Sequence, residues 1–399
     1  MCRTAAVKYH QHMDTLPPSV DVVMLGTFST WRLGTIQARA LPFATSLAEL
    51  GVRAAIVTTP WDAPAEAGVV DVAGGIPVIN TDSVSTRLPV RAIRQQVEWV
   101  RRFNPAVVHV LKPRGFGGLA ARMLERSYPI VVDSDDWEGD GGWNDSGNYP
   151  WLQQRVFHHQ ELDLLTRAGH VSAASTLLAQ RARQLRPRRE HSVHQIENGL
   201  TAERVQTMAA ARAIRQSEVD PPVVVLYSRF AEFEDTWLQR FVTALRSRGT
   251  TSLTVRVIGR DRIPADPPAI DGSITLDLMG YVASQDVPAL LGSTTVAVYP
   301  YQDSLITRAK QSVKLLELMA AGCPIIASDV GDVAGTLGAG GRILQSADPV
   351  SFATEVCDLL ECPTHLNEMS ALAMARIRDR YTFSALAPRM LALYQQAGL

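Results

Sequence analysis

The sequence of 399 residues lacks several features that would place it in particular classes of protein. It has only four cysteines, and their spacing does not show the pairs that are typical of a metal site. We therefore interpret them as reduced thiols and expect a cytoplasmic protein. No apolar run reaches the roughly 18 residues of a membrane-spanning helix, and the N-terminus shows no apolar core of a signal peptide. A formal net charge of −1 gives no general attraction to nucleic acid or to anionic membrane, so we expect neither as a partner. These features do not predict an oligomeric state.

Lysine is also scarce, because only four of the 39 basic side chains are lysines: Lys8, Lys112, Lys310 and Lys314. A lysine provides a compact ammonium where arginine provides a planar fork, so each lysine against this arginine background draws attention to its position. Three of the four, Lys112, Lys310 and Lys314, lie in stretches that also contain other candidate binding residues.

What is present is the pattern of a globular α/β protein. Length suggests two domains, and 46% hydrophobic and 20% charged residues are typical of a folded soluble chain. Short β-branched runs alternate with stretches of helical spacing, the series breaks in a polar stretch, and a second series follows. This predicts two α/β domains with parallel sheets covered on both faces. The expected divisions are a flexible leader at 1–19, an N-terminal domain at 20–200, a linker at 201–222, a C-terminal domain at 223–380 and a C-terminal helix at 381–399 that crosses back to the N-terminal domain.

Ligands of such sheets bind beyond the carboxyl ends of the strands, and paired domains are expected to form a cleft. The first strand is followed by "VMLGTFSTWRLG", which lacks the G-x-G-x-x-G spacing of a dinucleotide site. A dehydrogenase is therefore disfavoured.

The stretch "RAKQSVKLLELMAAGCPIIASDVG", residues 308–331, gives the strongest functional indication. It predicts a helix over 312–321 that stops at a glycine before a buried strand. The first turn presents backbone N–H groups and the positive end of the helix dipole, and Lys310 and Lys314 add charge, which together suit a diphosphate. Glu317 lies about one turn further on, where its carboxylate could accept from two vicinal ribose hydroxyls. The same spacing also fits a capped surface helix with solvated lysines.

This stretch resembles the C-terminal signature of the GT-B glycosyltransferases, in particular the large retaining family four, whose members carry a helix like "KLLEYMAAGxPVIAS". The resemblance continues in order along nearly the whole chain. "RLGTIQARALPFATSLAELG" looks like the Gly loop and first helix, "IENGL" like the turn before the linker, and "VVVLYSRF" like the strand that opens the donor domain. "LMGYVASQDVPALLGSTTVAVYP" is similar to the stretch that cradles the base. The resemblance implies an α/β protein of GT-B fold, with two Rossmann-like parallel-sheet domains facing each other across a cleft.

The resemblance also implies roles for particular residues. Glu317 corresponds to the second glutamate of the family's pair and should bind the ribose, while the amides around residues 311–313 should meet the distal phosphate. Arg229 and Lys314 are expected to be catalytic, because their positive charges would stabilise the negative charge of the departing diphosphate. The implied donor-binding set is Gly34, Arg229, Tyr281, Val282, Arg308, Lys310, Gln311, Ser312, Val313, Lys314 and Glu317.

Three departures from the family pattern stand out. Ala309 occupies the position of the first glutamate, which puts the usual hydrogen bonds to the transferred sugar in doubt. The lysine about six residues beyond Arg229 is missing, although the basic residues of 308–314 could supply its charge, as in a similar branch with a "K-x-x-x-K-L-L-E" form. Where members carry a histidine near the reacting sugar, this chain has Asp135, which we expect to be catalytic.

That aspartate belongs to "YPIVVDSDDWEGDGGWNDSGNYPW", residues 128–151, a strand that ends in acid, tryptophan and glycine. Carboxylates there could hold hydroxyls, tryptophans could stack on a sugar, and glycines would let the loop fold over substrate. Its Asp-x-Asp pair could hold a divalent ion, but the resemblance implies a diphosphate stabilised by cations and amides, so no metal is expected. Alternatively, Asp133 and Asp136 cap a turn and a helix. The expected acceptor-binding residues are Trp31, Arg32, Lys112, Arg114, Asp133, Asp136, Trp137 and Trp143.

Two nearby features have structural interpretations. His109, inside "VVHVL", is read as a hydrogen-bonded core histidine, and the basic amphipathic helix at 87–103 is expected to pack on its own sheet, although such a helix can also dock on an anionic membrane.

The sequence therefore predicts a glycosyltransferase that moves a sugar from a GDP- or UDP-linked donor to a soluble small-molecule or sugar acceptor, with retention and without a permanently bound cofactor. An epimerase or phosphorylase of the same fold is an alternative, although a pyridoxal phosphate enzyme needs a dedicated lysine in this lysine-poor chain. A non-catalytic sugar-nucleotide-binding protein is a further alternative, because the first glutamate is absent.

Overall fold

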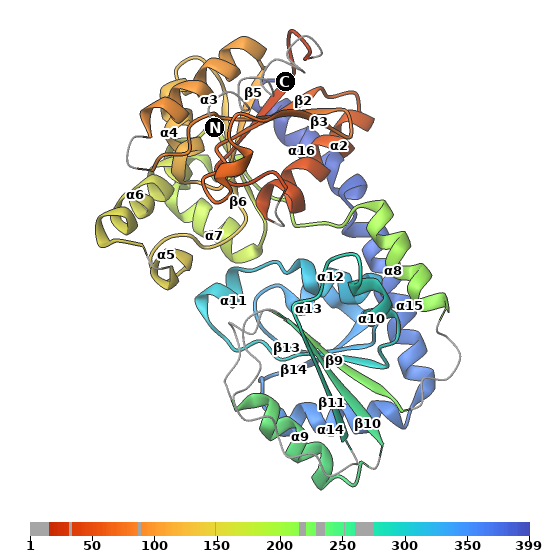
Figure 1. Cartoon of the computed structure of the whole chain (residues 1–399). Coiled ribbons are helices and arrows are strands. Elements are labelled where there is room, and N and C mark those ends of the chain that lie inside the picture. Colours follow the sequence, from red (N-terminus) through yellow and green to blue (C-terminus); the bar gives the residue numbers. More distant parts are fainter. Residues whose placement is uncertain are drawn as a thin grey trace. The chain divides into compact units, whose positions relative to one another are not determined.

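The computed structural model describes residues 16–31, 34–86, 89–147, 149–214, 221–228, 236–250, 252–259 and 274–399. The chain forms two compact units (Figure 1). The first contains the chain up to Asn198 together with Ala309–Gln311 and Leu386–Leu399. The second contains Gly199–Arg308 and Ser312–Ala385.

The first unit is built on a sheet with the strand order β3-β4-β2-β1-β5-β6-β7-β8 among its described residues. Neighbouring strands are parallel except for β3 and β4, which pair antiparallel. The strands are β1 (Val22–Gly26), β2 (Ala54–Thr58), β3 (Val70–Ala73), β4 (Ile76–Asn80), β5 (Val107–Leu111), β6 (Ile130–Ser134), β7 (His170–Ala173) and β8 (Val193–Gln195).

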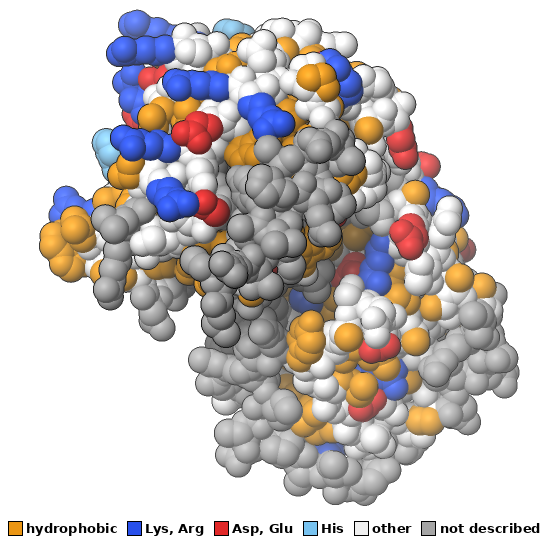
Figure 2. Space-filling model, turned by 45° about the horizontal axis from the view of Figure 1, so that its top comes forward, with side chains coloured by type: hydrophobic (Ala, Val, Ile, Leu, Met, Phe, Trp, Pro, Cys, Tyr) orange, Lys and Arg blue, Asp and Glu red, His pale blue; other side chains and the backbone are white. Residues whose placement is uncertain are grey.

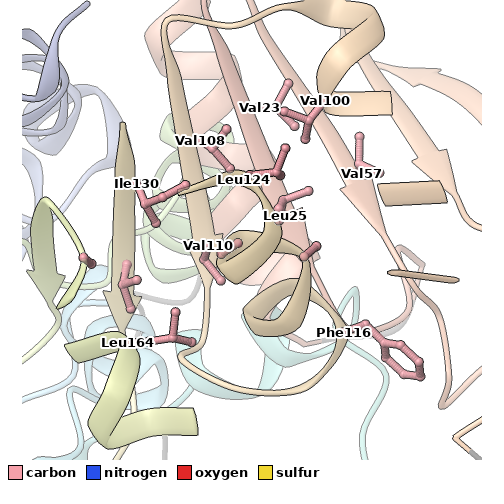
Figure 3. Packing of buried hydrophobic residues seen from close by; sticks show 14 of the residues in the cluster. Val23, Leu25, Val57, Val100, Val108, Val110, Phe116, Leu124, Ile130 and Leu164 are labelled. Carbon is pink, nitrogen blue, oxygen red and sulfur yellow. The ribbon is translucent and has the colours of Figure 1, made fainter. Parts of the chain in front are cut away.

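One face of this sheet carries a hydrophobic core (Figure 3). Alternate residues of a strand point to the same face, and Val23 and Leu25 of β1 meet Val108 and Val110 of β5 there. Among the described residues, four helices contribute buried side chains to that core: α3 (Val90–Phe103), α4 (Gly115–Leu124), α6 (Trp151–Arg167) and α7 (Thr176–Leu185). The unit also contains a π-helical turn at Ile36–Ala40 that continues into α2 (Leu41–Glu49), the short helix α5 (Trp143–Ser146) and most of α16 (Phe383–Ala397).

Basic side chains gather on part of the protein surface (Figure 2). In α3 the apolar residues Ile93 and Val97 are buried in the core. The exposed side chains of this helix include Arg91, Arg94, Arg101 and Arg102. The apolar face of this helix therefore packs on its own sheet, as the sequence predicts.

The second unit has a parallel sheet in the order β11-β10-β9-β12-β13-β14 among its described residues. Its strands are β9 (Val223–Tyr227), β10 (Leu253–Ile258), β11 (Ile274–Gly280), β12 (Val296–Tyr299), β13 (Ile325–Ser328) and β14 (Gly341–Leu344). Successive residues of β9 enter different clusters, since Val224 and Leu226 pack with α9 (Trp237–Ser247) and α14 (Pro349–Leu360), while Val225 and Tyr227 lie in the other core. That second core is lined by α8 (Ala202–Ile214), α10 (Val287–Gly292), α12 (Val313–Ala320), α13 (Val333–Leu337) and α15 (Pro363–Arg380).

Two elements differ from the sequence-based expectation. The hairpin of β3 and β4 was not predicted, although Gly74 and Gly75 at its turn both have the positive φ that such a turn needs (57° and 84°). Residues 202–214, expected within a polar linker, form α8, because Val205 and Met208 on one face pack into the core of the second unit. Within the described ranges, none of the helices combines the length and apolar character needed to cross a membrane.

Candidate active site

In the second unit, the start of α12 has the local geometry of an anion site. Ser312 precedes the helix with an extended backbone (φ −84°, ψ 118°), and its side chain makes no capping hydrogen bond. The first turn carries no acidic residue. Backbone N–H groups at a helix start have no partner within the helix, and the helix dipole favours an anion beside them.

Glu317, one turn further along α12, is largely buried with 8% of its surface exposed. Its Oε1 accepts hydrogen bonds from Nε (3.0 Å) and Nη2 (2.6 Å) of Arg204 on α8. Its Oε2 accepts from the hydroxyl of Tyr227 at the end of β9 (2.8 Å). Burial and the negative charge of Glu317 raise the pKa of Tyr227 well above its usual value, so this hydroxyl stays protonated and donates.

Lys314 completes this group, since its Nζ lies 3.8 Å from the centre of the Tyr227 ring. Such a contact between an ammonium and an aromatic face holds the cation in one place. Lys314 and Glu317 are thus brought together as the sequence predicts, whereas Arg204 and Tyr227 were not singled out by sequence reasoning.

The residues just before α12 are more buried than a solvated loop would be. Gln311 is only 4% exposed, and neither side-chain amide atom has a hydrogen-bond partner among the described residues. Its backbone oxygen accepts from Nδ2 of Asn198 at 2.9 Å. Lys310 beside it is half-buried, as is Val313 after it. A buried amide without partners is costly, so the Gln311 side chain is a polar group suited to meet a ligand.

The remaining donor candidates are spread around the second unit. Arg308 at the end of α11 (Leu305–Ala309) is ion-paired with Asp303. Tyr281, directly after β11, is 64% exposed, while the neighbouring Val282 packs against the core. Arg229 lies outside the described residues.

In the first unit, Lys112 lies at the centre of the acidic loop. It follows β5 with a left-handed backbone (φ 67°), which is uncommon for a residue other than glycine. Its Nζ lies 3.0 Å from Oδ1 of Asp135, 2.8 Å from Oδ2 of Asp136 and 2.7 Å from Oε1 of Glu138. The ammonium donates hydrogen bonds to Asp136 and Glu138 and forms an ion pair with Asp135. We therefore assign Lys112 to holding this loop rather than to contacting an acceptor.

The same three carboxylates could form a metal site by geometry alone, since one oxygen of each lies within 4.8 Å of the others. The Lys112 ammonium already contacts all of these carboxylates. The chain thus supplies a positive charge of its own to these three carboxylates.

Burial changes the proton affinity of this group. Desolvation raises the pKa of Asp135 to about 6, with repulsion from Asp136 and Asp133 adding to the rise and Lys112 opposing it. Desolvation acts against the charge of Lys112, but the surrounding carboxylates outweigh it and raise the pKa of the ammonium well above its usual value. The carboxyl of Asp135 therefore exchanges a proton near pH 6.

Arg114 supports the other side of Glu138, whose Oε2 lies 3.0 Å from Nη2 of Arg114. The guanidinium packs against the rings of Tyr149 and Phe157, with its carbon 5.7 Å and 5.1 Å from their centres. Its Nη1 is buried and has no hydrogen-bond partner within the described part of the chain. Arg114 thus retains a donor for a further polar group.

The glycines of the loop are required by close packing. A Cβ on Gly142 would lie 2.1 Å from the backbone oxygen of Trp137, and Gly141 has a φ of 75°. That same oxygen accepts from the backbone N–H of Trp143 at 3.0 Å. The Trp137 ring lies against the guanidinium of Arg181, 3.9 Å from its carbon. The loop is therefore a folded unit in which Trp137 has a structural contact, and Trp143 lies on its short helix α5.

Asp133 has a different setting from the one the sequence suggests. It is fully buried, and its carboxylate pairs with Nε and Nη2 of Arg39 (2.6 Å and 2.8 Å). The hydroxyl of Ser172 donates to the same carboxylate at 2.6 Å. Arg39 donates further to the backbone oxygens of Ile196 and Glu197. We therefore assign Asp133 to a buried ion pair and remove it from the proposed acceptor contacts.

His109 is confirmed as a hydrogen-bonded core histidine. Its Nδ1 lies 2.7 Å from the hydroxyl of Tyr394 on α16. Burial lowers the pKa of His109 to about 4, although Asp133 opposes the decrease. The ring is therefore neutral at physiological pH.

The N-terminal loop residues are placed only in part. Trp31 is 47% exposed, and Gly34 is half-buried where the π-helical turn begins, with its oxygen accepting from the N–H of Ala38. Arg32 lies outside the described residues.

The two buried groups predict opposite effects of pH on stability. The folded pKa of His109 (about 4) lies below its ordinary value of 6.5, so the unfolded chain binds this proton more strongly and stability falls as pH falls from 6.5 to 4. The folded pKa of Asp135 (about 6) lies above 3.8, so this group adds stability as pH falls from 6 to 3.8. From pH 7 to 5, we expect the stability of His109→Gln relative to the unmodified protein to rise by about 2 kcal/mol, and that of Asp135→Asn to fall by about 1 kcal/mol. Urea unfolding at pH 7, 6 and 5 measures both, and parallel pH profiles for all three proteins would contradict the assignment.

Two family models match the chain. Residues 34–199 match the family model described as glycosyl transferase 4-like domain, and residues 221–362 match the model described as glycosyl transferases group 1. A search of curated proteins found no match.

Solved structures share the fold across nearly the whole chain. Sucrose-phosphate synthase from Thermosynechococcus elongatus superposes with a TM-score of 0.67 at 16% identity, covering 94% of this chain and 98% of that chain. HepE from Anabaena in complex with UDP and glucose gives 0.63 at 14% identity, with coverage of 94% and 99%. The N-terminal domain of trehalose-6-phosphate phosphatase from Candida albicans gives 0.70 at 11% identity, with coverage of 96% and 97%.

Two α/β units with these sheet orders, together with these likenesses, define the GT-B fold. The chain belongs to the group 1 glycosyl transferases and is a glycosyltransferase enzyme.

Proposed function

We propose that this enzyme transfers a sugar from a GDP- or UDP-linked donor to a soluble small-molecule or sugar acceptor, with retention of anomeric configuration. The observation that carries the proposal is the start of α12, where a helix N-terminus without an acidic residue lies beside Lys314 and one turn before Glu317. A diphosphate fits the amides and the cation, and the adjoining ribose fits the carboxylate. HepE, which shares the fold, has been solved with UDP and with UDP-glucose, which supports a donor of this class.

In this proposal the chemistry depends on charge placed where the leaving group develops it. As the bond from C1 of the sugar to the diphosphate oxygen breaks, the amides of Gln311, Ser312 and Val313 and the cation of Lys314 stabilise the departing diphosphate. Lys310, Arg308 and Arg229 add positive charge, and Tyr281 and Val282 line the base. The acceptor oxygen bonds to C1 on the same face, and its proton passes to the departing phosphate. The chain's own cations fill the role that a metal would otherwise take.

The first unit is proposed to bind the acceptor. Asp135, whose pKa is raised to about 6, is the candidate to hydrogen-bond the reacting sugar or acceptor. The candidate contacts are Arg114, whose Nη1 has no hydrogen-bond partner among the described residues, Asp136, and the tryptophans Trp31, Trp137 and Trp143. The free thiols of Cys323, Cys357 and Cys362 fit a reducing compartment, so we place the reaction in the cytoplasm.

Binding of nucleoside diphosphates tests the donor assignment. Thermal unfolding is measured with UDP, GDP and dTDP, because a ligand at a hundred times its Kd adds roughly 2.7 kcal/mol to native stability. At least one of the three should raise the melting temperature of the unmodified protein and of Arg94→Met, an exposed control on α3. Mixing that nucleotide's sugar donors with soluble sugars should then yield a glycoside with the donor's anomeric configuration. No stabilisation by any of the three nucleotides would refute the proposal.

A further inference from the structure

The hydrogen bonds around Glu317 limit what this carboxylate can accept from a ligand. An ionised carboxylate offers about four lone-pair positions, two on each oxygen. Oε1 already accepts from two N–H groups of Arg204, and Oε2 accepts from the hydroxyl of Tyr227. Among the described residues, three positions are therefore taken, and one position remains, on Oε2.

Both partners of Glu317 are held firmly. Arg204 lies in the first turn of α8, its backbone N–H donates to Oγ1 of Thr201 (3.1 Å), and its Nη1 donates to the backbone oxygen of Ser284 (2.8 Å). The Tyr227 side chain comes from a buried strand. Because its phenol stays protonated, Tyr227 donates to Glu317 and does not compete for a ligand's hydroxyl proton.

We infer that Glu317 accepts a hydrogen bond from one ribose hydroxyl of the donor and not from two, because Arg204 and Tyr227 occupy its other positions. This inference rests on the proposed function and specifies its substrate class. A donor that lacks the ribose hydroxyl not bound by Glu317 binds as well as the parent nucleotide, whereas a donor that lacks the bound hydroxyl binds more weakly. Arg204 is then a positioning residue that sets this tolerance without touching the ligand.

The physical basis is the cost of an unpaired group. A site that reads two hydroxyls rejects both monodeoxy analogues, since each leaves a buried acceptor unsatisfied. A site with one open position rejects only the analogue that lacks the hydroxyl it reads. The other hydroxyl has no place on this carboxylate, so its removal costs nothing at Glu317.

The test compares three ligands built on the base that stabilises the protein best: the ribonucleoside diphosphate, its 2′-deoxy form and its 3′-deoxy form. Calorimetric titration of the unmodified enzyme should give one deoxy form a Kd within about threefold of the parent and the other a Kd weaker by roughly tenfold or more. In Arg204→Met, Oε1 is released to accept the second hydroxyl, so the tolerated deoxy form should now also bind roughly tenfold more weakly than the parent. Arg204→Lys, which restores one donor, should recover part of the tolerance, and Arg94→Met should leave all three ratios unchanged.

The outcomes separate the inference from the proposed function. If the parent diphosphate binds and both deoxy forms are weakened in the unmodified enzyme, the one-hydroxyl reading is wrong while the donor assignment stands. If both deoxy forms bind like the parent, Glu317 reads neither hydroxyl and the inference is also wrong. If no parent diphosphate binds, the proposed function fails and the inference fails with it. The three dissociation constants of the unmodified enzyme test the inference even if a variant does not fold.

Discussion

Replacing Lys112 by methionine is expected to lower the free energy of unfolding by about 3–5 kcal/mol, the usual cost of removing one partner from a buried ion pair. The reason is that Asp135, Asp136 and Glu138 would lose the ammonium that contacts each of them within 3.0 Å. The side chain of Glu138 is only 2% exposed, so water cannot replace that contact. Urea unfolding at pH 7 measures the loss.

If lost charge pairing causes this effect, the stability of the same variant should also depend on pH. Lowering the pH protonates Asp135, which has lost the ammonium in this variant, so Lys112→Met should recover stability relative to the unmodified protein between pH 7 and 5. Adding Asp135→Asn should recover part of the loss at pH 7, because a neutral amide then replaces one of the carboxylates that lost the ammonium. Arg94→Met serves as the matched control for removing an exposed cation. A loss under 1 kcal/mol, independent of pH, would contradict a central role for Lys112.

Replacing Lys314 by methionine is expected to reduce kcat by roughly 10²–10³-fold, the typical effect of removing one group that stabilises charge in the transition state. In the proposed reaction Lys314 meets the diphosphate as negative charge develops on it. Binding of the diphosphate itself should weaken less than turnover, because the charge is greatest as the sugar bond breaks. Initial rates of nucleoside diphosphate release over a range of donor concentrations separate the effects on kcat and on KM.

A structural explanation of that loss can be tested directly. Lys314 also contacts the Tyr227 ring, so Tyr227→Phe, which keeps the ring, should preserve this contact and most of kcat. Lys314→Arg should retain part of the activity because it keeps the charge, though not the compact ammonium. A Lys314→Met enzyme with kcat within threefold of the unmodified enzyme would show that this cation does not stabilise the leaving group.

Much of the fold could be predicted from sequence because it depends on local patterns. β-branched runs alternating with helical spacing indicate the two α/β series, and the glycine after α12 predicts its end, where Gly322 has a φ of 63°. The hairpin of β3 and β4 was missed because its strands are short, and because Asp71 within β3 and Pro77 within β4 break the pattern of a strand. Helix α8 was missed because its few buried residues are set among alanine and arginine, so only packing against the second unit reveals its apolar face.

The site was predictable as far as it lies in one stretch of sequence. Lys314 and Glu317 share a helix, and their spacing alone places them near each other. The partners of the buried carboxylates are distant in sequence. Arg204 contacts Glu317 across 113 residues, and Arg39 contacts Asp133 across 94. No local spacing predicts such a pair. The acid-rich loop stays a predicted ligand contact, but the sequence could not show that Lys112, from another strand end, contacts its carboxylates.

The measurement that tests the central claim most directly is a crystal structure of the enzyme with the nucleoside diphosphate that stabilises it best. The account predicts the diphosphate at the amides that begin α12, within reach of Lys314, and one ribose hydroxyl donating to Oε2 of Glu317. A nucleotide bound elsewhere, with the start of α12 occupied by solvent alone, would contradict it.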